Sequence, residues 1–310
     1  MAEMMYTVSS SPHIRTKTTV QTVMRDVLIA LLPATIAGIY FFKIQALLVI
    51  LTSVISCVAF EALWQKIMKQ KITVFDLSAA VTGLLLAFNL PASIPLWIPV
   101  VGSAFAIIIV KQFFGGVGQN IMNPALAARA FLLASWPVQM TNWTVDGVSA
   151  ATPLAILKEG TGALPSLMNA FIGNMGGTIG ETSVLALLLG GAYLLYKKII
   201  SWHIPGIYIG TVFVLTFVFG RNGFMSGNAL YELLIGGLML GAFFMATDYT
   251  TSPITKKGQV IYAVGCGVMT SVIRIYGGYP EGVSYSILFM SLFVPLIDKY
   301  TKPRAFGGAK

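Results

Sequence analysis

Residues 77–110 read LSAAVTGLLLAFNLPASIPLWIPVVGSAFAIIIV, without a single charged side chain. The stretch is longer than the roughly 20 apolar residues that an α-helix needs to cross a bilayer. Pro91, Pro95 and Pro99 interrupt it, and proline breaks a helix because it lacks a backbone donor. The stretch therefore predicts one short membrane helix, a re-entry and a second helix.

The composition of the whole chain has the same character. Of its 310 residues, 56% are hydrophobic and 10% are charged, and the mean hydropathy is +0.80. Ordinary soluble domains carry about 25% charged residues, so a soluble fold is excluded and an integral membrane protein is predicted. The net charge of +9 is what basic loops beside apolar spans produce, and we expect no nucleic-acid partner.

Similar apolar stretches recur along the chain, and they predict an all-α polytopic membrane protein. About ten spans are expected, near 26–43, 44–64, 76–90, 94–113, 121–136, 182–197, 199–220, 228–247, 258–275 and 282–298. Most Lys and Arg residues then fall on the side of the two termini, which the positive-inside rule places in the cytoplasm. The predicted order is a cytoplasmic tail 1–25, a five-helix unit 26–136, an extracytoplasmic loop 137–181, a second five-helix unit 182–298 and a cytoplasmic tail 299–310.

The two units carry a related signal. FGG at 114–116 follows Lys111, and YGG at 276–278 follows Arg274, each before the last span of its unit. An odd number of spans per unit would make the two repeats inverted relative to each other. The alternative is that Gly-rich turns are simply common between membrane helices.

Five carboxylates fall within or at the ends of apolar spans: Glu61, Asp76, Glu232, Asp248 and Asp298. A charge at membrane depth is costly and usually faces a protein interior or a water-filled cavity. Asp76 and Asp298 are interpreted as helix-end residues, and Glu61 in the same way. Glu232 and Asp248 flank a Gly-rich helix and are the candidates for an ion route.

Other polar residues carry weaker signals. Asn123-Pro124 is typical of a helix N-cap followed by proline, although an opening between half-helices is the functional alternative. Cys57 and Cys266 lie inside apolar runs, which offers no disulfide framework. Two histidines far apart in the sequence predict no metal site.

The loop between the two units contains the sequence DGVSAATPL at 146–154. By local physics, Thr152 is a good N-cap and Pro153 suits the first helical position, so a short helix through Lys158 is expected. The same residues resemble the pattern Asp-Gly-x-Ser/Thr-Gly-Ala-Thr, by which flavin transferases recognise a threonine and esterify it with the phosphate of FMN. The match covers Asp146, Gly147, Ser149, Ala151 and Thr152, whereas Ala150 stands where the pattern usually has glycine.

Further motifs from the N-terminus to the last span resemble one family. They are SPH at 11–13, VTGLLLA at 81–87, FGGVGQN at 114–120, NPA at 123–125, ATD at 246–248 and GYPEGV at 278–283. Together with the loop motif they are similar to the RnfD proteins of Rnf electron-transport complexes. They are shared more loosely with the NqrB proteins of the Na+-translocating NADH:quinone reductase, which have a longer N-terminal region.

The resemblance implies a redox subunit of a translocase that couples ferredoxin:NAD+ electron transfer to Na+ or H+ movement and is not active alone. It implies FMN bound covalently to Thr152 on the extracytoplasmic side, with Asp146, Gly147, Ser149 and Ala151 serving recognition. The related reductase protein also holds non-covalent riboflavin, which leaves a second flavin open. Expected partners are the other Rnf proteins RnfA, RnfB, RnfC, RnfE and RnfG, a flavin transferase using FAD, and the lipid bilayer.

The resemblance also implies two inverted five-helix repeats, similar to urea-type channels, in the bacterial or archaeal cell membrane. No catalytic residue is assigned. The alternative from another class is a solute channel or secondary transporter of this architecture without flavin. A structural anchor for redox partners is a third hypothesis, and it requires no flavin on Thr152.

Overall fold

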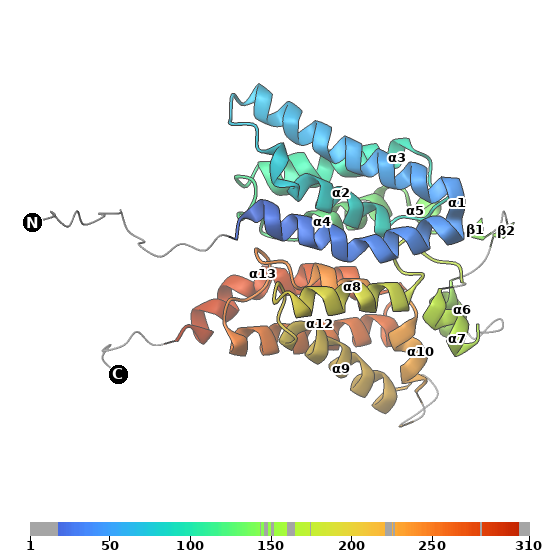
Figure 1. Ribbon diagram of the computed structural model, residues 1–310. Helices are drawn as coiled ribbons and strands as arrows, with labels where there is room; N and C mark the ends of the chain where they lie inside the picture. The colour runs from blue at the N-terminus through green and yellow to red at the C-terminus, as the bar shows by residue number, and fades with distance from the viewer. Residues whose placement is uncertain are drawn as a thin grey trace, which may run out of the picture.

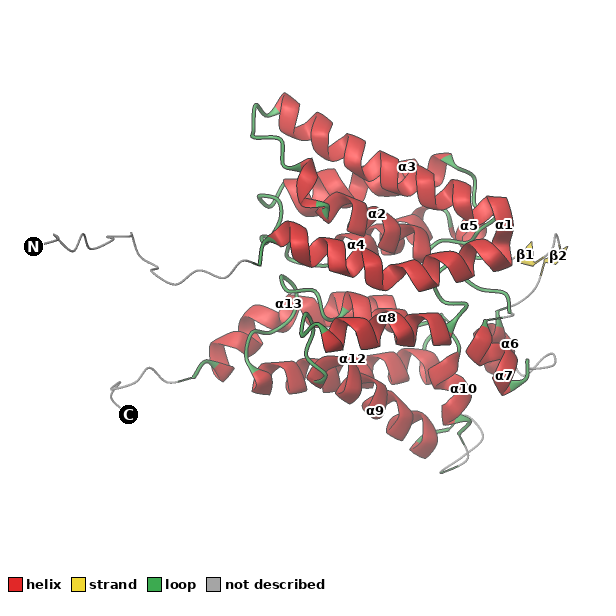
Figure 2. Ribbon diagram, in the orientation of Figure 1, coloured by secondary structure: helices red, strands yellow, loops and turns green. Residues whose placement is uncertain are grey.

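The computed structural model describes residues 18–142, 144–145, 148–149, 152–159, 165–173, 175–220, 225, 227–279 and 281–303. In this part of the chain the regular structure is helical, as expected, except for one small hairpin (Figure 2). Its two-residue strands, β1 (Thr144–Val145) and β2 (Val148–Ser149), pair antiparallel.

The first half of the chain begins with α1 (Val20–Ile67), which covers the first two predicted spans. Lys43 is non-helical, with φ 56° and ψ −139°, and it divides α1 into two legs that diverge in Figure 1. The half continues with η1 (Val74–Asp76), α2 (Ser78–Phe88), α3 (Trp97–Ala104), η2 (Phe105–Gln112) and α4 (Pro124–Ser135). The last turns of the fourth predicted span, η2, are a π-helix.

Three short helices lie in the segment between the halves: α5 (Pro137–Met140), α6 (Pro153–Glu159) and α7 (Leu167–Ile172). The second half comprises α8 (Val184–Tyr196), α9 (His203–Val218), α10 (Ala229–Leu234), α11 (Leu238–Leu240), η3 (Gly241–Met245), α12 (Lys256–Tyr276) and α13 (Val283–Thr301). Figure 1 shows the halves as two groups of helices, one above the other. They contact each other through α1 with α8 and through α4 with α13.

Several helices suit a membrane by length and apolarity. Among the described residues, α1, α12 and α13 are long and apolar enough to cross a bilayer, and five further helical segments are shorter but apolar. Large apolar side chains cover the outer surface of α1, where Ile36 is 66% and Ile55 is 63% exposed. Such a surface is stable against lipid and costly in water. The chain is a multi-pass membrane protein.

The short helix predicted before Pro91 is present as α2. Its 11 residues span about 16 Å, roughly half of the hydrocarbon core. Carbonyl groups at the end of a helix need partners, above all in a membrane. The carbonyls of Phe88 and Leu90 accept hydrogen bonds from the N–H groups of Gly180 (3.0 Å) and Ile179 (3.1 Å), which precede α8. The break in the helix is therefore satisfied by backbone from the segment that joins the halves.

Candidate functional site

A pocket of about 920 Å³ opens at the end of the molecule where α6 lies. We call it the loop-side pocket. The polar residues that line it come from both halves and from the connecting segment: Asn89, Arg129, Thr141, Thr152, Glu181, Thr182, Glu281 and Ser284. Tyr279 and Tyr285 add aromatic rings to the lining.

Thr152 lies at the start of α6, where the sequence predicts an N-cap. Its Oγ1 accepts a hydrogen bond from the N–H of Ala155 at 3.2 Å, and Pro153 occupies the first helical position. Lys158 in the last turn donates to the carbonyl oxygens of Gly277 and, at 2.6 Å, Gly278. The predicted short helix is confirmed, and Lys158 fixes it to the loop that precedes α13.

The rest of the loop motif is only partly placed. Asp146, Gly147 and Ala151 lie outside the described residues, as does Ala150. Ser149 lies in β2, opposite Thr144. Of the five predicted flavin-site residues, Thr152 is therefore the one whose surroundings the structure describes.

A cluster of three charged side chains forms the floor of the loop-side pocket. We call Arg129, Glu181 and Glu281 the loop-side charge cluster. Arg129 of α4 donates from Nη1 to Asn89 Oδ1 (3.0 Å) and Ser284 Oγ (2.9 Å), and from Nη2 to Glu281. Its Nη1 lies 3.5 Å from Glu181 Oε1. The cluster joins α4 to the segments that precede α8 and α13.

The two carboxyl groups of the cluster have different proton affinities. Burial, together with the negative charge of Glu281, raises the pKa of Glu181 to about 8. For Glu281, burial opposes ionisation, but the charges of Arg129 and Arg274 and hydrogen bonds to Glu181 and Arg129 together lower the pKa. Near neutral pH the cluster therefore holds one positive charge, one negative charge and one protonated carboxyl.

A second pocket, of about 820 Å³, lies between the halves near the start of α1, where Val23 lines it. We call it the terminus-side pocket. Its polar lining comprises Ser78, Thr82, Lys111, Asn120, Asn123, Thr247, Asp248 and Thr250. Asp248 accepts hydrogen bonds from the hydroxyls of Thr250 (2.9 Å) and Thr251 (3.2 Å).

The two candidates for an ion route do not meet. Asp248 lines the terminus-side pocket, whereas Glu232 is 4% exposed on α10 and lies 3.3 Å from Arg274 Nη1. Arg274 lies near the end of the predicted span 258–275 and is fully buried in α12.

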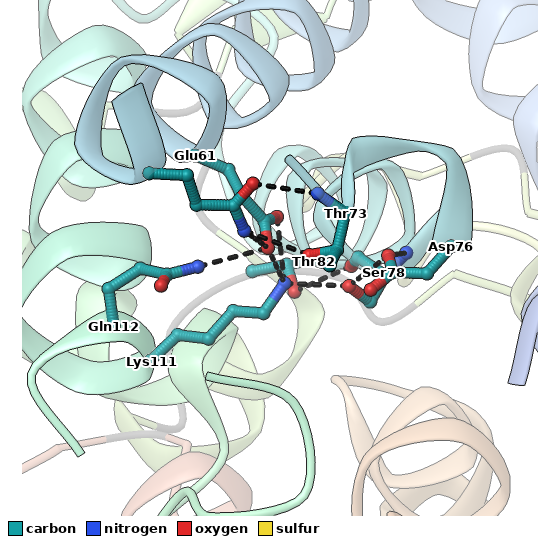
Figure 3. A network of polar contacts seen from close by, with 8 residues as sticks. Glu61, Thr73, Asp76, Ser78, Thr82, Lys111 and Gln112 are labelled. Carbon is teal, nitrogen blue, oxygen red and sulfur yellow. Dashed lines mark hydrogen bonds and ion pairs between the residues drawn. The ribbon is translucent and has the colours of Figure 1, made fainter. Parts of the chain in front are cut away.

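Glu61 is not the helix-end residue that the sequence suggested. It is fully buried, and Lys111 Nζ donates to both of its oxygens at 2.9 and 2.8 Å (Figure 3). Lys111 also donates to Ser78 Oγ at 2.7 Å, and Gln112 donates to Glu61 at 3.0 Å. Asp76, in contrast, accepts from the N–H of Ser78 at 2.8 Å at the start of α2, as a helix-end residue should.

The Asn123-Pro124 motif forms the predicted N-cap, and the alternative of an opening between half-helices stays a prediction. Asn123 Oδ1 caps α4 by accepting from the N–H groups of Ala125 (3.1 Å) and Leu126 (3.4 Å). Its Nδ2 donates to the carbonyl of Met245 at 3.4 Å, across the interface of the halves, and the residue lines the terminus-side pocket.

Comparisons with known proteins bear on the family. The model of the NQR2, RnfD, RnfE family matches residues 7–307. The chain belongs to this family.

Relatives from three organisms match nearly the whole chain. It is 56% identical to the D subunit of the Na(+)-translocating ferredoxin:NAD(+) oxidoreductase complex of Acetobacterium woodii, over 100% of this chain and 98% of that protein. It is 49% identical to the D subunit of the proton-translocating ferredoxin:NAD(+) oxidoreductase complex of Clostridium ljungdahlii, over 97% of this chain and 96% of that protein. It is 40% identical to the D subunit of the ion-translocating oxidoreductase complex of Stutzerimonas stutzeri, over 94% and 93%. The resemblance seen in the sequence motifs is confirmed.

Proposed function

We propose that this chain is the RnfD protein of an Rnf-type ion-translocating ferredoxin:NAD+ oxidoreductase, and that Thr152 carries FMN through a phosphoester. The identity to the D subunits of such complexes extends over the whole chain, which supports the first part. Like any single component of such a complex, it would act only with its partners, for which we propose RnfA, RnfB, RnfC, RnfE and RnfG. The relatives named above include one sodium-translocating and one proton-translocating complex, so the transported ion stays open.

The observation that carries the FMN proposal is the place of Thr152 on the wall of the loop-side pocket. The lining fits a flavin through the rings of Tyr279 and Tyr285, which can stack on an aromatic ring system. A flavin held there would supply one-electron chemistry at a site shared by both halves. The protein would position it, exclude water and set the charge around it.

Attachment requires a second enzyme, because nothing in the described part of the pocket is arranged to activate the Thr152 hydroxyl. We propose a flavin transferase that uses FAD. The bond formed joins Thr152 Oγ1 to the FMN phosphorus, the pyrophosphate bond of FAD breaks, and AMP leaves with the electrons of that bond. Thr152 is half-buried at the pocket rim, so its hydroxyl can be reached before the flavin settles.

For the topology we propose ten membrane spans in two inverted five-helix repeats, similar to urea-type channels. Helical segments lie at all ten predicted positions. The first helix of one half contacts the first helix of the other, α1 with α8, and the last helices contact each other, α4 with α13. Lys111 and Arg274, at matching places in the two repeats, are each buried beside a glutamate. This pattern is what an inverted repeat produces.

The orientation proposed from the charge distribution agrees with the arrangement of the helix ends. The start of α1 and the end of α13 lie at the same end of the molecule, and α6 lies at the opposite end (Figure 1). We propose that in a bacterial or archaeal cell membrane both termini face the cytoplasm and the flavin lies on the outer side. Asp248 then faces the cytoplasmic pocket, and it is a better candidate for an ion route than the arginine-paired Glu232. We propose the same pocket as the place for a second, non-covalent riboflavin.

The test is flavin fluorescence of the denatured protein in gels, after co-expression with a flavin transferase. Thr152→Ala should abolish the fluorescent band. Thr141→Ala is the matched control, because Thr141 lines the same pocket and its hydroxyl donates to the Pro137 carbonyl at 2.8 Å. A band that survives in Thr152→Ala refutes the attachment. Saturable solute flux through liposomes containing the chain alone, without any flavin adduct, would favour the channel alternative.

A further inference from the structure

The loop-side charge cluster has two carboxyl groups for one guanidinium, and both carboxyls are largely buried. Glu181 is 7% exposed, and the side chain of Glu281 is 14% exposed. With all three groups ionised, the floor of the pocket would carry a net negative charge in a poorly solvated place. Such an excess charge is costly, and it is normally removed by binding a proton or a cation.

The hydrogen bonds show which carboxyl carries the excess charge. Arg129 directs Nη2 to Glu281 and Nη1 to Asn89 and Ser284. Glu281 Oε1 also accepts from the N–H of Gly237 at 2.8 Å. Glu181 Oε1, by contrast, is buried and accepts no hydrogen bond within the described part of the chain, although Arg129 Nη1 lies 3.5 Å away.

The two carboxyl groups also lie against each other. They share the space above Gly237, where an added methyl group would contact Oε1 of both Glu181 and Glu281. When one of the two is protonated, it can hydrogen bond to the other. Two carboxyls this close retain one proton between them, because two adjacent negative charges repel each other strongly.

Among the described residues, few other polar or charged groups face this pair. Arg274 of α12 stabilises the charge of Glu281, and Tyr285 of α13 interacts with Arg129. Thr178, which precedes α8, lies beside Glu181. These groups stabilise Glu281 as the carboxylate and leave Glu181 as the member that takes the proton.

We propose that Glu181 and Glu281 form a carboxyl pair that binds one proton on Glu181, at the floor of the pocket that Thr152 lines. The ligand is a proton from water on the loop side, and the reaction is Glu181–COO⁻ plus H⁺ giving Glu181–COOH. When the proton is bound, Arg129, Glu181 and Glu281 together give the pocket no net negative charge. This makes it compatible with the arrival of an electron on a bound flavin, a consequence that rests on the proposed function.

The charge of the carboxyl pair determines whether the midpoint potential of a bound flavin rises or falls. As pH rises through the pKa of Glu181, about 8, the pair gains one negative charge inside the pocket. A negative charge beside a flavin disfavours its reduction, so the midpoint potential should fall by an additional step over this pH interval. Below the interval Glu181 is protonated and contributes no such step.

The first test does not need the flavin. Infrared spectra of Thr152→Ala protein, recorded against pH, should show a protonated carboxyl band near neutral pH that shifts in D2O and disappears above pH 8. Glu181→Gln and Glu281→Gln should each remove it, the second because Arg129 then pairs with Glu181 alone. Glu232→Gln is the matched control, since Glu232 is also buried beside an arginine but outside this pocket.

Two outcomes would overturn the proposal that Glu181 and Glu281 bind a proton. The first is that Glu181 is fully ionised at neutral pH. The second is a carboxylate signal of Glu181 that responds to Na+ but not to choline, because the pocket would then bind a metal cation instead of a proton. Since the D2O shift is measured without changing either glutamate, the test stands even if the substituted proteins misfold.

The second test uses the complex with its flavin. Potentiometric titrations between pH 6 and 10 should show the additional step in the unmodified protein and its loss in Glu181→Gln. Flavin content is checked by fluorescence in the same samples. If the infrared spectra show the protonated carboxyl pair but Thr152 carries no flavin, the proposed function is refuted while the proton-binding pair is retained. A fully loaded flavin whose potential has the same pH dependence in both proteins would refute the link between the pair and the flavin.

Discussion

The loop-side and terminus-side pockets lie at opposite ends of the interface between the halves and are similar in size, about 920 and 820 Å³. Each contains a buried basic side chain from the first half, Arg129 in one and Lys111 in the other. Lys111 is balanced by a single carboxylate, Glu61, while Arg129 faces two. The two pockets therefore differ mainly in how the charge of their buried basic side chain is balanced.

The largest expected effect is a difference in activity between substitutions of Thr152, in the loop-side pocket, and Thr247, in the terminus-side pocket. Thr152→Ala should reduce ferredoxin:NAD+ activity of the assembled complex to background, because the flavin loses its attachment. Thr247→Ala, in the terminus-side pocket, should leave activity and flavin content near the unmodified level, since its hydroxyl only donates to the Phe243 carbonyl at 2.7 Å. Enzyme assays on purified complexes measure both. Normal activity in Thr152→Ala would support the structural-anchor hypothesis instead.

The next effect concerns stability and the balanced pair of the terminus-side pocket. Lys111→Met should destabilise the protein by about 3–5 kcal/mol, because Glu61 would remain buried without a positive partner. Denaturant unfolding of the detergent-solubilised protein measures this. The double variant with Glu61→Leu should recover most of the loss. A single variant as stable as the unmodified protein would contradict the described pair.

The smallest structural effect is expected at Asp248. Asp248→Asn keeps an acceptor oxygen for Thr250 and Thr251, so unfolding should change by about 1 kcal/mol or less. If Asp248 lies on the ion route, ion uptake by proteoliposomes of the complex should fall while flavin content stays constant. Glu232→Gln should leave uptake unchanged. Equal uptake by the Asp248→Asn and unmodified complexes would remove Asp248 from the route.

The features that the sequence predicted correctly depend on neighbouring residues. Thr152 and Asn123 cap their helices through N–H groups two or three residues away, and proline follows each directly. The short α2 ends just before Pro91, where the chain loses a donor. Apolar runs locate the helices because every backbone polar group within lipid must be hydrogen bonded inside the protein, which a helix achieves. The sequence-predicted domain boundaries remain predictions.

The features that were missed depend on residues far apart in the sequence. Glu61 meets Lys111 across 50 positions, and Arg129 meets Glu281 across 152. A single sequence shows that Glu61, Lys111 and Arg129 are costly charges within predicted spans, but not which charge compensates each of them. The break between α10 and α11 is another case, because Gly236 at φ +78° could be read only as part of a Gly-rich helix.

The most direct test of the account is mass spectrometry of the peptide that contains Thr152, from protein produced with and without a flavin transferase. We predict an FMN adduct on Thr152 that requires the transferase. Absence of the adduct, when the same transferase modifies a second substrate in the same cells, would contradict the account.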